Sequence, residues 1–128
     1  MRSEWLTYCL FQISMHEMSV AQNIIEIVKE HIPKEAGEKV KRIRLKIGEL
    51  SGVVPDSLTF CFDILKNGST LQNAVIEIEY IPITAQCRSC GETSKLEYGI
   101  FLCPKCYSSD NLLLTGNELN IVEIELED

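Results

Sequence analysis

Four cysteines stand in two closely spaced pairs, and this spacing is the part of the sequence best suited to chemistry. Cys87-Arg-Ser-Cys90 and Cys103-Pro-Lys-Cys106 are separated by twelve residues. Each C-x-x-C turn can direct two sulfurs at one centre, and a hairpin between two such turns brings four thiolates into the tetrahedral arrangement that suits Zn²⁺. The predicted zinc ligands are Cys87, Cys90, Cys103 and Cys106.

Cysteine pairs could also serve in a thiol oxidoreductase or in a disulfide framework. A thiol oxidoreductase would leave one pair free of metal and reducible, and a disulfide framework would suit a secreted protein. The two matched pairs, with Cys9 and Cys61 far apart in the sequence, favour metal binding in a reducing compartment. The N-terminal stretch lacks the basic start and the cleavage site of a signal peptide, and no run of about 18 uninterrupted apolar residues occurs, so no membrane-spanning helix is expected. We therefore expect a cytoplasmic protein.

A zinc ion held by four protein ligands has no position left for water, so we predict a structural and not a catalytic ion. No glycine-rich phosphate loop and no set of nucleophile, base and acid is recognisable in the rest of the sequence. We therefore expect that the chain is not an enzyme.

Nucleic-acid binding by a zinc-ribbon adaptor is the alternative function, and the charge argues against it. The chain has 19 acidic and 12 basic side chains, which give a net charge of −7. Near the cysteines, Arg88, Lys95 and Lys105 are opposed by acidic neighbours, and we expect them to offset the charge of the thiolates. An adaptor that binds nucleic acid or protein remains the second interpretation.

Hydrophobic periodicity predicts the elements that must position these residues. Residues 19–32 and 55–67 have the spacing of amphipathic helices, and residues 40–48, 76–80 and 120–127 alternate as half-buried strands do. The strand positions expected to face the core are Ile43, Leu45, Ile47, Ile76, Ile78, Tyr80, Val122, Ile124 and Leu126, with the charged residues between them facing outward.

The outward faces of these strands also predict their order. Residues 40–48 place Arg42 and Arg44 outward, whereas the other two strands place glutamates outward. Opposite charges on facing positions stabilise a strand pair, and like charges oppose pairing. We therefore predict that the basic strand lies between the two acidic strands.

The predicted fold class is α+β, with a small three-stranded sheet, two helices and an inserted zinc-ribbon module. The insert covers residues 83–114 and divides an α/β domain into residues 15–82 and 115–128. A segment of this size buries too little apolar surface to fold without a metal. Residues 1–14 are expected to be an N-terminal extension.

Four motifs, taken in order, resemble the HypA/HybF family of hydrogenase nickel-incorporation proteins. They are the Met15-His16-Glu17 opening, the stretch LKIGELSGVVPDSLTFCFD, the double C-x-x-C insert and the terminal GNELNIVEIELED. The resemblance runs from Met15 to the C-terminus. It implies a nickel-binding α/β domain joined to a zinc-ribbon domain.

The resemblance implies a metallochaperone that binds Ni²⁺ transiently and delivers it to the large subunit of [NiFe]-hydrogenase with a partner GTPase. A role with urease maturation proteins and a homodimer are further expectations. In the family the histidine, here His16, is the nickel ligand and the amine of the preceding methionine, here Met15, contributes. An amine, a backbone nitrogen and an imidazole can fill three corners of a square plane around Ni²⁺, and Glu17 could fill or support the fourth.

The residues before Met15 depart from this pattern, because they tie its amine into a peptide bond. The abrupt start of the resemblance at a methionine favours translation from Met15. In that case residues 1–14 are an artefact of the chosen start. If instead the extension is native, the nickel site lacks its terminal amine.

Overall fold

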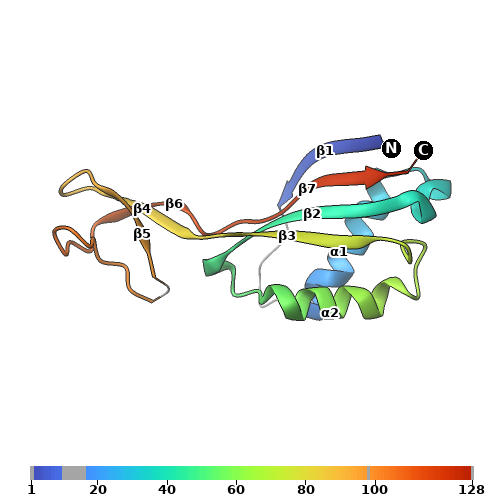
Figure 1. Cartoon of the computed structure of the whole chain (residues 1–128), viewed down its shortest axis with the longest axis horizontal. Helices are drawn as coiled ribbons and strands as arrows, with labels where there is room; N and C mark the ends of the chain where they lie inside the picture. Colours follow the sequence, from blue (N-terminus) through green and yellow to red (C-terminus); the bar gives the residue numbers. More distant parts are fainter. Residues whose placement is uncertain (1, 10–16, 98, 128) are drawn as a thin grey trace.

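The chain folds into two sheets that lie at opposite ends of an elongated molecule (Figure 1). A computed structural model describes residues 2–9, 17–97 and 99–127. The helices and strands are β1 (Arg2–Cys9), α1 (Glu17–His31), β2 (Val40–Gly48), α2 (Pro55–Lys66), β3 (Val75–Ile81), β4 (Ile83–Cys87), β5 (Thr93–Leu96), β6 (Asn111–Thr115) and β7 (Leu119–Leu126), with short 3₁₀ turns η1 (Lys34–Lys39) and η2 (Glu49–Ser51).

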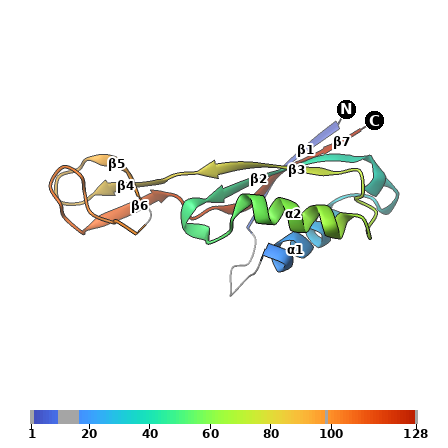
Figure 2. The ribbon, with the colours of Figure 1, turned by 60° about the horizontal axis from the view of Figure 1, so that its bottom comes forward.

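The larger sheet has the order β1-β7-β2-β3, and the two helices cover one of its faces (Figure 2). We call this sheet with its helices the body. β2 is parallel to β3, and β7 is antiparallel to both β1 and β2. The α+β class is confirmed, but the sheet has one strand more than the three predicted. The unpredicted strand, β1, pairs only with β7 from the far end of the chain, so local sequence gives little sign of it.

The predicted strand order is confirmed, because basic β2 lies between the two glutamate-bearing strands. Arg42 Nε lies 2.8 Å from a Glu77 carboxylate oxygen on β3, and Arg42 Nη1 lies 3.1 Å from Glu125 on β7. Arg44 Nε lies 3.0 Å from Glu123 Oε1, as an ion pair without hydrogen-bond alignment. Opposite charges on neighbouring strands therefore hold the sheet face that the helices leave uncovered.

The core of the body lies between the helices and the sheet. α1 buries Val20, Ile24 and Val28, and α2 buries Leu58 and Phe62, as their spacing predicts. Against them pack apolar residues of β2 and β7, which are Val40, Ile43, Leu45, Ile47, Leu119, Ile121, Ile124 and Leu126. None of the helices among the described residues is long and apolar enough to cross a membrane.

Two of the predicted inward positions are wrong. Tyr80 is 50% exposed and lies near the end of β3, which is an edge strand of the sheet among the described residues. Val122 is only half-buried, and Ile121 takes its place in the core. The pairing of β2 with β7 shifts between Arg44 and Leu45, so one extra residue of β7 reverses the alternation at this point.

The two glutamates of β7 that were predicted to face outward do lie away from the core, yet they are almost fully buried. Glu123 is 3% exposed and Glu125 is 5% exposed. Both carboxylates lie within ion-pair distance of the β2 arginines. Burial of a carboxylate is tolerated when a charged partner accompanies it.

The smaller sheet has the order β5-β4-β6 and forms the ribbon, residues 83–115. Its apolar core consists of Ile83, Ala85 and Leu96, and Leu50 of η2 packs against them from the body. Leu50 N also donates to the Gly116 carbonyl at 2.7 Å. In the described part of the chain, the ribbon is attached by its two chain connections, and the Leu50 side chain and the backbone hydrogen bond at Gly116 reinforce the joint.

Candidate metal centre

The two C-x-x-C turns have the same backbone geometry. In the first turn, Gly91 N donates to the Cys87 carbonyl at 2.8 Å, and in the second, Tyr107 N donates to the Cys103 carbonyl at 2.8 Å. Each bond reverses the chain directly after the second cysteine of the pair. The turns are therefore equivalent halves of one site, and each half contributes two sulfurs from the same side.

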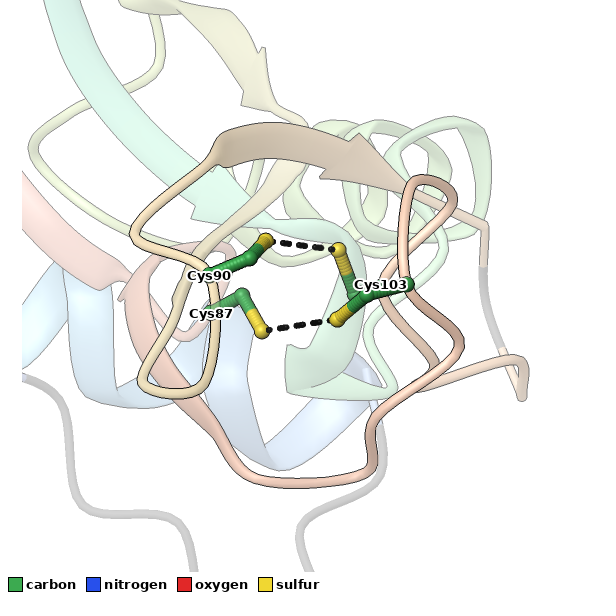
Figure 3. Close-up of side chains that lie close together, drawn as sticks. Cys87, Cys90 and Cys103 are labelled. Atoms are coloured by element: carbon green, nitrogen blue, oxygen red, sulfur yellow. Dashed lines mark hydrogen bonds between the residues drawn. The ribbon is translucent and has the colours of Figure 1, made fainter.

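The four sulfurs lie within 4.8 Å of one another. Figure 3 shows the side chains of Cys87, Cys90 and Cys103 converging from two facing loops. Across the loops, Cys87 Sγ lies 3.5 Å from Cys106 Sγ, and Cys90 Sγ lies 3.7 Å from Cys103 Sγ. A tetrahedral zinc site with Zn–S bonds of about 2.3 Å has sulfur–sulfur edges of about 3.8 Å. The spacing of the sulfurs thus fits a structural zinc ion.

The first cysteine of each pair is buried and the second is exposed. The amide of Cys90 outweighs desolvation and lowers the pKa of Cys87 to about 6. In the same way, the amides of Cys106 and Lys105 lower the pKa of Cys103. Amides that point at a sulfur stabilise its thiolate, which is the form that binds a metal.

The exposed cysteines behave in the opposite way. The amide of Ser108 lowers the pKa of Cys106, but the nearby sulfur of Cys87, desolvation and the other thiols together raise that pKa to about 12. At Cys90 the amide of Glu92 lowers the pKa, and desolvation and neighbouring sulfurs outweigh it. Four thiolates at this spacing repel one another, so a divalent cation at their centre would relieve the repulsion.

The basic residues near the site make contacts that differ from those predicted. Arg88 was expected to offset the charge of the thiolates, but it forms an ion pair with Asp110 at 3.5 Å. Lys105 pairs with Glu92 at 3.6 Å, although its backbone N lies 3.4 Å from Cys103 Sγ. Backbone amides donate to the sulfurs, whereas the charged groups of Arg88 and Lys105 pair with carboxylates. The same ion pairs also leave fewer cations available for a phosphate backbone.

Sequence reasoning missed an asymmetry between the two turns. Gly91 has a φ of 79°, and Tyr107 at the matching position has a φ of 62°. A left-handed backbone is easy for glycine but costs about 1–2 kcal/mol in other residues. Aligning the two C-x-x-C motifs would have shown this position, since both residues directly follow the second cysteine. Ile100 makes only an isolated bridge to Glu97, and Leu102 lies in no strand.

The predicted nickel ligands stand near the N-terminus, far from the four cysteines in the sequence. Met15 and His16 lie outside the described residues, whereas Glu17 is half-buried and begins α1. The other histidine, His31, stands in the last turn of α1 with its Nδ1 2.8 Å from the Ile27 carbonyl oxygen. His31 is therefore engaged at a helix end, where the carbonyls favour a donor.

Comparison with known proteins agrees with this arrangement. The sequence profile of the HypA family, described as "Hydrogenase/urease nickel incorporation, metallochaperone, hypA", matches residues 15–126. The hydrogenase maturation factor HypA of Trichormus variabilis is 46% identical over 114 residues, which cover 89% of this chain and 97% of that protein. The corresponding protein of Nostoc punctiforme is 45% identical over the same shares of the two chains.

Two solved structures have a similar fold. The solution structure of the Ni metallochaperone HypA from Helicobacter pylori matches with a TM-score of 0.59 and 26% identity, over 88% of this chain and 97% of that one. A second solution structure of a HypA protein matches with a TM-score of 0.63 and 27% identity, over 89% and 98% of the two chains. β1 (Arg2–Cys9) precedes the range that the family profile matches.

Proposed function

Because the chain belongs to the HypA family of nickel-incorporation metallochaperones, we propose that it binds Ni²⁺ through His16 and hands the ion on during hydrogenase maturation. The observation that carries the proposal is the Met15-His16-Glu17 sequence, which stands at the first matched residue of the family profile and leads into α1. Zinc held by Cys87, Cys90, Cys103 and Cys106 keeps a structural role in this proposal.

The imidazole of His16 is the central ligand. In a chain that begins at Met15, the terminal amine and the next backbone nitrogen complete three corners of a square plane. Glu17 supports or fills the fourth corner. A site of this kind lies at a chain end, so a recipient protein can reach the bound ion. Protonated imidazole has no lone pair to donate, so nickel binding weakens as the solution is acidified.

The recipient is the large subunit of a [NiFe]-hydrogenase, and a maturation GTPase works with the chain in the transfer. Urease maturation proteins are further candidate partners, because the family description names both enzymes. The chain carries the ion and catalyses no reaction of its own. Its place of action is the cytoplasm, where the thiolates of the ribbon stay reduced.

Calorimetry with Ni²⁺ tests the proposal on the full chain and on the chain that begins at Met15. His16→Ala is compared with His31→Ala, which removes the only other histidine. We expect His16→Ala to weaken nickel binding at least about tenfold in both chain lengths, since a direct ligand is lost. We expect His31→Ala to leave the affinity unchanged. The shorter chain should bind more tightly if the amine of Met15 is a ligand.

Equal nickel affinity in the parent and in His16→Ala would refute the assignment of the site. Metal analysis on the same samples should find one zinc per chain in each variant, because the ribbon cysteines are untouched. The adaptor alternative is less well supported, because Arg88 and Lys105 already pair with carboxylates in the ribbon. Retention of a labelled nucleic acid by the zinc-loaded chain would favour that alternative.

A further inference from the structure

A cavity lies in the body where the end of α1, the turn η1 and the loop after α2 meet. Its volume is about 610 Å³. Figure 1 shows these three segments at the end of the body that faces away from the ribbon. Cavities that bind small molecules commonly have volumes of about 300–1,000 Å³, with a mostly apolar lining and a few polar groups. The cavity therefore has the size of a small-molecule site.

The apolar part of its lining comes from the segment that follows α1. Ile32, Pro33 and Gly37 all line the cavity. Ile32 is buried and also belongs to the core of the body. Pro33 has an extended backbone, with φ of −59° and ψ of 146°, so the chain leaves the helix here and turns into η1. A hydrocarbon group in the cavity would thus rest on residues that the core holds in place.

Two sides of the cavity are fixed to one another. A Cβ at Gly37 would lie 2.5 Å from Thr70 Oγ1, so η1 can approach the loop this closely only because residue 37 is glycine. Asn73 Nδ2 of the same loop donates to the Glu38 carbonyl of η1 at 3.2 Å. The cavity is therefore formed before any ligand enters, which lowers the cost of ordering on binding.

The polar part of the lining carries an excess of positive charge. It consists of Lys29, Glu30, Lys34 and Thr70. In the part of the chain that the structure describes, neither lysine forms an ion pair, and Glu30 forms none either. Two ammonium groups and one carboxylate leave a local charge of +1, in a chain whose net charge is −7. The cavity is thus suited to a ligand with a single negative charge.

We propose that this cavity binds a small monocarboxylate with an apolar body. The carboxylate accepts hydrogen bonds from the ammonium groups of Lys29 and Lys34 and from the Thr70 hydroxyl, and the hydrocarbon part covers Ile32 and Pro33. Hydrogen bonds between ionised partners are the strong ones, and they set the orientation of the ligand. A dianionic phosphate fits less well, because the Glu30 carboxylate opposes its second charge.

This site is separate from both metal sites. α1 has 15 residues, so at about 1.5 Å per residue its two ends are about 22 Å apart. The Met15-His16-Glu17 sequence leads into the start of α1, whereas the cavity lies at its end. The four cysteines lie in the ribbon. The proposal therefore does not depend on nickel binding, and it can fail while the proposed function holds.

An NMR titration of the zinc-loaded full chain with 4-phenylbutyrate tests the proposal. We expect saturable shifts of the amide signals of Lys34, Gly37 and Thr70, which lie around the cavity. Three further probes separate the parts of the ligand. 4-Phenylbutanol lacks the charge and acetate lacks the apolar body, so each should bind at least about tenfold more weakly. Phenyl phosphate carries a second charge and should also bind more weakly than 4-phenylbutyrate.

Charge-matched variants test the assignment of the lysines. Lys29→Gln and Lys34→Gln should each raise the Kd of 4-phenylbutyrate at least about fivefold, since each removes one ammonium partner. Thr70→Val should raise it by about twofold, because only a neutral hydroxyl is lost. Lys46→Gln on β2 is the control, since it removes the same charge from the body at a distance from the cavity, and it should leave the Kd unchanged.

Several results would overturn the proposal. They are the absence of shifts at millimolar 4-phenylbutyrate, shifts that centre on another part of the chain, and tighter binding of phenyl phosphate or 4-phenylbutanol than of 4-phenylbutyrate. An equal loss of affinity in Lys46→Gln and Lys34→Gln would also do so, because net charge alone would then explain the binding. The amide spectrum of each variant, recorded without ligand, shows that its fold is intact.

Discussion

The body and the ribbon reach a folded state by different means. The body buries an extended apolar core between its two helices and the strands β2, β3 and β7, with Phe62 and Ile43 fully enclosed. The ribbon encloses only Ile83, Ala85 and Leu96, and leaves three leucines of β6 partly exposed. Apolar burial contributes about 25 cal/mol per Å², so the ribbon gains little from its core. A metal ion held by its four cysteines would supply the missing stability.

The body and the ribbon are joined by close contacts, yet each keeps its own core. Leu50 is the side chain of the body that packs into the ribbon core, and backbone hydrogen bonds near Gly48 and Gly116 support it. A Cβ at Gly48 would lie 2.0 Å from the Gly116 carbonyl oxygen. Close backbone contact at this joint therefore requires glycine, while the two cores on either side remain distinct.

Loss of a zinc ligand gives the largest expected difference between the two parts. Cys103→Ser should release the zinc and unfold the ribbon, since structural zinc contributes on the order of 10 kcal/mol. The body should stay folded on its own core. Metal analysis and hydrogen exchange at Ile83 and Ile43 measure the two effects. Cys61→Ser, at a half-buried cysteine of α2, is the control and should keep its zinc. Ribbon amides that remain protected in Cys103→Ser would contradict this dependence.

Acid should also release the zinc from the ribbon. The pKa of Cys87 is lowered to about 6, so its thiolate persists as the pH falls from neutral and takes up a proton below about 6. The pKa values of Cys90 and Cys106 are raised, so protons compete with zinc for these two sulfurs already at higher pH. Zinc affinity should therefore decrease continuously with falling pH. A chelating dye measures the release, and a flat affinity between pH 8 and pH 6 would contradict it.

A cavity in the core of the body should lower the stability of the body strongly. Phe62→Ala should lower the free energy of unfolding of the body by about 3–5 kcal/mol, because a buried aromatic ring is removed. Phe60→Ala on the same helix removes an exposed ring and should change it by less than about 0.5 kcal/mol. Urea unfolding followed by circular dichroism compares the two. Equal effects would show that α2 packs differently.

Removing one charge from the ion pairs on the sheet face of the body should have an intermediate effect on its stability. Glu123→Gln removes the charge that lies 3.0 Å from Arg44 and should destabilise the body by about 1–2 kcal/mol, because Glu123 is buried. Glu79→Gln on exposed β3 serves as the control and should have almost no effect. Unfolding in low and high salt measures both variants. A loss in Glu79→Gln as large as that in Glu123→Gln would mean that burial does not decide the strength of these pairs.

Truncating the side chain that joins the body to the ribbon should have the smallest effect on stability. Leu50→Ala should destabilise the ribbon by about 1 kcal/mol, since a half-buried leucine contributes only part of its burial energy. Faster hydrogen exchange at Ala85 and Leu96, with zinc content unchanged, is the expected result. Leu65→Ala, which touches the core of the body, should instead speed exchange in the body. If both variants affected the ribbon alike, the two cores would not be independent.

The sequence predicted the elements whose signals are local. The helical stripes of α1 and α2, the alternation of β2 and the C-x-x-C spacing each depend on neighbouring residues, and the structure has all of them. Charge patterns on three strands also predicted their order, because pairing energies depend on which side chains face one another. The resemblance to the HypA family was likewise recognised from short motifs, each made of neighbouring residues.

Other features depend on contacts between residues that are distant in the chain. β1 pairs with β7, and the extra residue at Val122 exists only relative to the register of β2. The burial of Glu123, the reach of Leu50 into the ribbon and the ion pair of Arg88 with Asp110 likewise require the assembled structure. Local sequence determines which conformations a segment favours, whereas register and burial are decided by partners that only tertiary folding brings together.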